Sequence, residues 1–238
     1  MTGSEGYFTG WRMVTRWVGY IIAMIVWSSA AASYGQQTPA YDVISEYIRQ
    51  LAAIQDVQEA SSSDMQASKN QMMDAIRGST RIKLELSRNV YAFQAMKLDP
   101  PFDELLQQVI YFYQKKIELH DEVIEIESKF VTGPEPGVDY GKLAARMPQI
   151  TANLEYIDKS LYEQTRMFCL LLVDPRPDAK GVLSHFVVTR AQRKGLLSQI
   201  DHSFGARFSA NNPSYTVSSA AFIKGCLESK HKSADDPW

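Results

Sequence analysis

The chain is poor in the residues and motifs on which most enzymes and metalloproteins depend. Its 238 residues include two cysteines and four scattered histidines. It has no H-E-x-x-H zinc motif, no G-x-S-x-G nucleophile turn, no glycine-rich dinucleotide fingerprint and no calcium loop. Two cysteines alone do not make a four-ligand zinc site, and the absence of C-x-x-C-H excludes covalent haem attachment. We therefore expect a protein that is not an enzyme and has no cofactor.

The sequence also lacks a strong excess of either charge. Lysine and arginine number 25 and aspartate and glutamate 27, which gives a formal net charge of −2. Proteins that bind nucleic acid usually carry a clear basic excess, because they must neutralise phosphates. Nucleic acid is therefore not an expected partner, although the charge says nothing about a small ligand.

Long apolar runs are absent except near the start of the chain. Arg12 and Arg16 precede the apolar run Trp17–Trp27, and the small residues Ser28–Ala32 follow it. This order is typical of a secretory signal peptide, here residues 1–32, with cleavage after Ala32. A spanning helix needs about 20 apolar residues, so the run is short for an anchor, although an uncleaved anchor remains an alternative. We expect an extracytoplasmic protein, periplasmic or secreted, that touches the membrane only if this segment stays uncleaved.

What the sequence does contain is helical periodicity, most clearly in Pro101–Val131. Prolines at its start and the stretch Gly133–Gly137 after it mark the two ends. A helix of this length extends roughly 46 Å and cannot bury its apolar face without long neighbours. Its apolar residues recur at steps of three and four: Phe102, Leu106, Val109, Tyr113, Ile117, Ile124 and Val131.

The same periodicity elsewhere predicts an all-α fold, an antiparallel helical bundle in residues 33–230 followed by a disordered tail at 231–238. Shorter helices are expected at Tyr41–Val57 and Ser214–Ser229. Ser61–Ser63 are either a break, with Ser63 or Asp64 capping the next helix, or a weak, exposed piece of one long helix. Gly78 suggests a bend or a close helix crossing. The four long helices are expected at Asp64–Leu98, Pro101–Val131, Lys142–Val173 and Asp178–Phe208, the third becoming regular from Pro148.

Two polar residues, His120 and Glu127, continue the apolar stripe of Pro101–Val131. One interpretation is a buried pair that binds a ligand, a metal or a proton. The other is a stripe that drifts around the helix, which would leave both residues at the boundary with solvent and hydrogen-bonded to neighbours. The opposite side of the same helix carries an acidic face: Glu118, Asp121, Glu122 and Glu125.

Basic residues cluster at Arg190, Arg193 and Lys194, either as an anion or headgroup site, as partners for that acidic face, or as a solvated surface. The two cysteines, Cys169 and Cys226, both lie in the exported part, where a disulfide is the natural expectation. However, a complete fourth helix would separate them by about 20 Å, beyond disulfide reach. They meet if that helix ends early, for instance at Gly195, or if the tail folds across the bundle, so their pairing stays open.

These observations favour an exported, non-enzymatic helical bundle that binds a protein partner or the cell envelope. The first alternative is a bundle with a small ligand or metal in its core near His120 and Glu127. The second is a membrane-anchored periplasmic sensor or assembly factor. The sequence does not name the partner.

Overall fold

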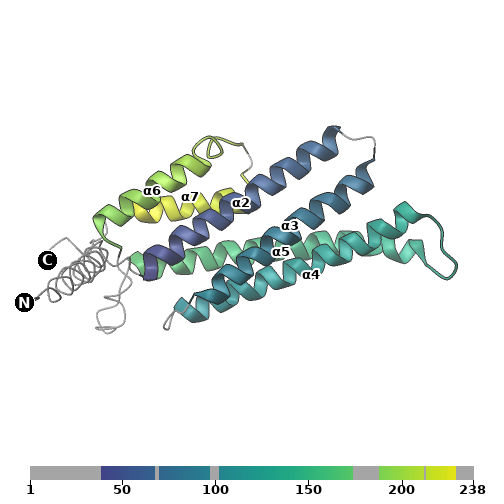
Figure 1. Ribbon diagram of the computed structural model, residues 1–238, viewed down its shortest axis with the longest axis horizontal. Coiled ribbons are helices and arrows are strands. Elements are labelled where there is room, and N and C mark those ends of the chain that lie inside the picture. Colours follow the sequence, from purple (N-terminus) through teal and green to yellow (C-terminus); the bar gives the residue numbers. More distant parts are fainter. Residues whose placement is uncertain (1–38, 68–69, 97–101, 174–187, 212, 229–238) are drawn as a thin grey trace, which may run out of the picture. The chain divides into compact units, whose positions relative to one another are not determined.

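The computed structural model describes residues 39–67, 70–96, 102–173, 188–211 and 213–228, all within the compact unit Thr38–Trp238. The regular elements in these ranges are all helices, which confirms the all-α fold (Figure 1). They are α2 (Pro39–Ala67), α3 (Gln71–Ala95), α4 (Phe102–Thr132), α5 (Tyr140–Val173), α6 (Arg190–Phe204) and α7 (Tyr215–Glu228).

Helices that follow one another in the chain pack side by side from α2 to α5, and this confirms the helical bundle (Figure 1). Helix α7 packs against both α5 and α2, and α6 packs against α2 and α7. The antiparallel course of α3 and α4 follows from two contacts: Phe93 stacks on Tyr113, and the Lys83 ammonium pairs with the Asp121 carboxylate. Short connections make sequence neighbours antiparallel neighbours, as expected for this class.

Four aromatic side chains from four helices form the centre of the core. The ring of Tyr47 lies 6.1 Å from that of Phe93 and 5.9 Å from that of Phe168, centroid to centroid. Phe93 in turn stacks on Tyr113 at 6.3 Å. All four rings are buried, and such offset pairs add to the free energy gained from burial alone. This layer therefore holds α2, α3, α4 and α5 together.

Polar groups of the turn from α4 to α5 form hydrogen bonds with one another. Gly133 and Gly137 adopt positive φ, which residues with a Cβ rarely do. The Tyr140 hydroxyl donates to the Gly133 carbonyl at 2.6 Å and accepts from the Glu135 amide at 3.1 Å. Asp139 accepts from the amide of Lys142 at 3.1 Å and so caps the start of α5.

The expected start of a helix at Asp64 is wrong, because α2 continues through it to Ala67. The cap of α3 is instead Asn70, whose side chain accepts from the Met73 amide at 3.2 Å. The serines around Ser61 do not break α2, because Ser61 is buried where α2 meets α3. A Cβ added to Gly78 would lie 3.1 Å from the Cβ of Ser61, so the glycine allows a close helix crossing.

Two other helix boundaries differ from those expected. Helix α5 already begins at Tyr140 and runs through Pro148. The carbonyl that loses its donor to the proline belongs to Ala144, which is exposed and so accessible to water. The helix expected over Asp178–Phe208 is wrong, because α6 begins at Arg190 behind a capping box at Thr189. The place of the fourth long helix is taken by α2, which has 29 residues.

Several expectations fall on residues outside the described ranges. They include the signal peptide or anchor at residues 1–32, the start of the expected helix at 178–187 and the tail at 231–238. Of the helices in the described ranges, none contains an apolar stretch long enough to cross a membrane.

Candidate functional site

The interior of the bundle places His120 and Glu127 differently. His120 is buried on α4, and neither of its ring nitrogens has a hydrogen-bond partner among the described residues. Burial, together with the Lys116 ammonium one turn away, lowers the pKa of His120 to about 4. The ring is therefore neutral near pH 7, which leaves one nitrogen as an acceptor and the other as a donor.

Glu127 lies two turns beyond His120, about 10 Å further along the helix axis. Its side chain is half-buried, and burial raises the pKa of its carboxyl group. Within the ranges that the structure describes, no three His, Cys, Asp or Glu side chains gather closely enough to hold a metal. The structure thus places His120 in the interior and Glu127 at its edge, and brings no third ligand to them.

A buried ion pair next to His120 was not anticipated from the sequence. The Lys116 ammonium on α4 contacts the Asp158 carboxylate on α5, and only 5% of the Lys116 side chain is exposed. The helical period did contain a signal, because position 116 lies one turn from both Tyr113 and His120 on the inner face. A charged residue at such a position needs a partner, since burying a lone charge is costly.

Two amides continue this polar interior on the side of α2 and α3. Gln50 is fully buried. Its side-chain amide donates to the Glu46 carboxylate at 2.8 Å and to the main-chain carbonyl oxygen of Asn89 at 3.3 Å. The Asn89 side chain is fully buried as well, and neither of its amide atoms has a partner in the described part of the chain. Unsatisfied buried polar groups each cost free energy, so this core is not optimised for stability alone.

The acidic face of α4 is neutralised by basic residues of the bundle. Its four acids pair as follows: Glu118 with Lys115, Asp121 with Lys83, Glu122 with Arg146 and Glu125 with Lys129. The basic cluster of Arg190, Arg193 and Lys194 is on α6, which packs on α2 and α7. Each acidic residue of the face therefore has a basic partner on α3, α4 or α5, so its charge is balanced without that cluster.

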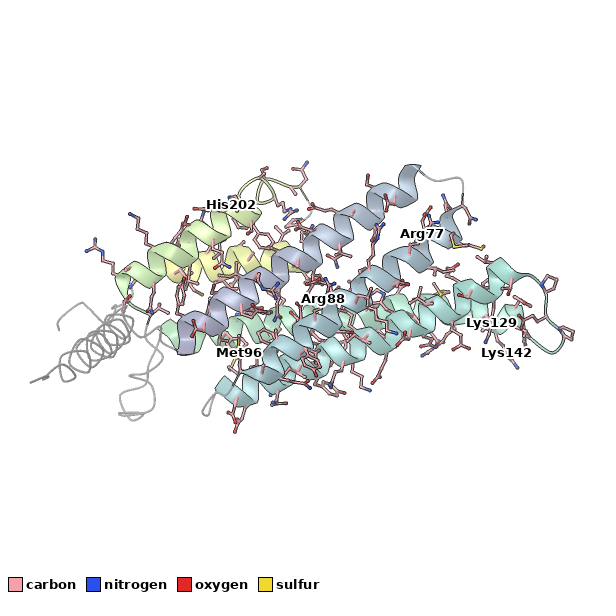
Figure 2. All side chains as sticks on the ribbon, viewed as in Figure 1. Arg77, Arg88, Met96, Lys129, Lys142 and His202 are labelled. Atoms are coloured by element: carbon pink, nitrogen blue, oxygen red, sulfur yellow. The ribbon has the colours of Figure 1, made fainter. Side chains whose placement is uncertain are left out.

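The outer face of α3 carries an exposed stripe that we call the α3 stripe: Leu84, Arg88 and Tyr91. The exposed fractions are 55% for Leu84 and 79% for Tyr91, and 76% for the side chain of Arg88. Figure 2 labels Arg88. Their spacing of four and three residues places them on one face of the helix. The sequence suggested only that the surface is rich in tyrosine and charge, because exposure depends on which face of α3 meets α2 and α4.

The course of α7 bears on the two cysteines. Asp158 and Tyr215 line one cavity, while the Arg166 guanidinium lies 5.9 Å from the centroid of the Phe222 ring, so residue numbers rise together and α7 runs parallel to α5. The expected separation of about 20 Å came from counting a long fourth helix at 1.5 Å per residue. That premise is wrong, because α6 has 15 residues. The side chain of Cys169 is outside the described part, so a disulfide to Cys226 stays a prediction that intact mass under non-reducing conditions would test.

No protein-family model, curated protein sequence or solved structure matches the chain. We therefore infer function from the geometry of the described residues. Two regions bear on function: the polar interior around His120 and Lys116, and the α3 stripe.

Proposed function

We propose that the chain is an exported, non-enzymatic helical-bundle protein that acts by binding another protein through the α3 stripe. The observation that carries this proposal is the exposure of Leu84 and Tyr91, with Arg88 between them, on one face of a helix. Tyrosine and arginine are enriched among the residues that dominate binding energy at protein interfaces. Positions i, i+4 and i+7 are the usual anchors when a helix docks into a groove.

The opposite face of α3 holds this stripe in position. Leu86, Val90 and Phe93 are buried against the rest of the core, so the helix that carries the stripe is already ordered. Binding through an ordered helix costs less entropy than binding through a segment that must first fold. Among the described residues, Arg88 makes a long contact within its own helix, 3.4 Å to Glu85, and 76% of its side chain is exposed and open to an acidic partner.

Export is the second half of the proposal and is supported by the order of residues near the start of the chain. Basic residues, a short apolar run and small residues follow one another there, as in a secretory signal. A cleaved chain would be periplasmic or secreted. An uncleaved one would be an anchored periplasmic sensor or assembly factor, with the α3 stripe exposed in both cases. The mass of the purified chain distinguishes the two.

Site-specific photocrosslinking tests the proposal. A photoreactive amino acid replaces Tyr91 in one variant and Tyr156 in the control. Tyr156 is also exposed, at 67%, but lies on α5. We expect a discrete crosslinked species from position 91 in cells of the source organism, abolished by Leu84→Ala with Arg88→Ala. Absence of a crosslink at 91, or equal crosslinking at 156, would reject the α3 stripe as the binding face.

A second candidate function is a bundle that holds a small ligand or metal in its core near His120 and Glu127. It is favoured by the two ring nitrogens of His120 that have no partner among the described residues. Elemental analysis and absorption spectra of protein from its native compartment test it. Loss of a copurifying metal or chromophore in His120→Leu, with retention in the exposed control His202→Leu, supports this candidate, and identical contents in both variants exclude it.

A further inference from the structure

A small cavity lies where α2, α3, α4, α5 and α7 meet. Its lining includes Tyr47 from α2, Tyr113 and Lys116 from α4, Asp158 from α5 and Tyr215 from α7. The space open to the centre of a water molecule is about 20 Å³. One water needs roughly 10–15 Å³ by this measure, so the cavity has room for a water and not for a larger molecule.

The polar groups in the cavity wall are incompletely paired. Tyr113 is 1% exposed, and its hydroxyl has no hydrogen-bond partner in the described residues. The buried Lys116 ammonium has three N–H donors, and the Asp158 carboxylate is the acceptor found for it within the described ranges. The residues that line the cavity therefore include a hydroxyl without a partner in the described residues, an ammonium with unused donors and a carboxylate.

The chemistry of these groups selects a neutral occupant that both donates and accepts. Lys116 and Asp158 already balance each other's charge, so an ion would add an uncompensated charge. An apolar occupant would leave the Tyr113 hydroxyl and the ammonium unsatisfied. A water molecule can accept a hydrogen bond from the ammonium, donate one to the carboxylate and form a third with the hydroxyl. Three partners lie within the two to four that are typical of buried water.

We propose that this cavity is a binding site for one ordered water molecule, which joins the Tyr113 hydroxyl to the Lys116–Asp158 ion pair. The water completes the hydrogen bonds of α4 to α5 and stabilises the buried charge. Tyr215, a partly exposed residue at the start of α7, lines the site, so water exchanges with solvent at this end of α7. The site is separate from the α3 stripe, because Leu86, which lines it from α3, is buried on the opposite face of that helix.

Tyr113→Phe tests the proposal against a matched control, Tyr47→Phe. The Tyr47 hydroxyl is bonded to Thr165 at 2.7 Å, so its removal lowers Tm whether or not the cavity is filled. Removing the Tyr113 hydroxyl lowers Tm only if the hydroxyl has an occupant to bond, and raises it if the hydroxyl is unsatisfied. We expect Tm to fall in both variants.

A crystal structure of the wild-type chain gives the direct readout. We expect a single density peak about 2.7–3.2 Å from the Tyr113 hydroxyl oxygen and from the Lys116 nitrogen. In Tyr113→Phe that peak weakens or shifts. An empty cavity together with a raised Tm in Tyr113→Phe would overturn the proposal, and density for a larger molecule would overturn the assignment to water.

Discussion

The bundle has two hydrophobic cores that differ in how many helices enclose them. The larger core surrounds Tyr47, Phe93 and Tyr113, and receives side chains from all six described helices. The smaller core, Val123, Ile126 and Ile150, lies between α4 and α5 near the turn that joins them. Lys129 and Lys142 flank that turn (Figure 2). Two helices exclude less water than six, so the smaller core depends more on ion pairs and on the hydrogen-bonded turn.

The largest effect should come from removing an aromatic ring from the larger core. We expect Phe93→Ala to lower the free energy of unfolding by about 3–5 kcal/mol, because the ring contacts Tyr47 and Tyr113 and the cavity cannot close. Ile150→Ala in the smaller core should cost about 2 kcal/mol, since that end relaxes more easily. Denaturation by guanidinium chloride measures both. Equal losses would show that the two cores are equally rigid.

The next effect concerns the buried ion pair. Asp158→Asn leaves the Lys116 ammonium without its counter-charge, and we expect a loss of about 3 kcal/mol in urea denaturation. The double variant Lys116→Met with Asp158→Leu should recover most of it, because it removes both charges. The exposed pair of Arg166 and Glu163 provides the control, where Glu163→Gln should change stability by less than about 1 kcal/mol. A small loss in Asp158→Asn would mean that solvent reaches the ammonium.

His120 should make the larger core sensitive to acid. The pKa of its ring is about 4 in the folded chain, against the ordinary value of 6.5 expected after unfolding. Between these values the unfolded chain binds more protons, so stability falls as the pH falls from about 6.5 to about 4, by roughly 3 kcal/mol. His120→Leu should lose this part of the pH dependence, while His202→Leu keeps it. Parallel pH profiles for all three proteins would contradict the burial of His120.

The smallest effect is expected at the surface of the smaller core. Arg146 on α5 contacts Glu122 on α4 at 2.5 Å, but both side chains are more than a quarter exposed. Arg146→Ala should therefore lower the midpoint of urea denaturation only slightly, and the difference should shrink in high salt. Urea denaturation at two ionic strengths measures it. A larger and salt-independent loss would indicate that this pair holds the far end of α4 and α5 together.

Local signals in the sequence predicted some elements well and could not predict others. Helix α4 was predicted to within one residue at each end, because prolines, glycines and an apolar stripe all mark the same segment. Helix α2 was predicted too short, because the serines around Ser61 are weak helix formers in isolation. They are helical through the close contact with Gly78, which joins residues that are 17 positions apart and leaves no local pattern.

The candidate site was also only partly predictable, because it depends on contacts between helices that leave no local pattern in the sequence. The period of α4 left His120 either on the inner face or at the boundary with solvent, and the structure places it on the inner face. Which side chains meet there depends on the register between α4 and α5, so the pairing of Lys116 with Asp158 was not predictable from either helix alone. Glu127 falls at the edge because the inner face of a long straight helix rotates away from its neighbours. The α3 stripe was missed for a related reason, since exposure is decided by neighbouring helices.

The closing of the bundle by α6 and α7 has a consequence for the order of folding. Gln55 on α2 accepts a hydrogen bond from Ser214, and Ser45 donates to Gln199, across 159 and 154 positions of the chain. Consecutive helices can pair early, because short loops close quickly, whereas these contacts need almost the whole chain. During synthesis the inner face of α2 therefore cannot be fully buried until α6 and α7 have been made. An unfinished chain would leave the apolar face of α2 exposed until α6 and α7 have been made and can cover it.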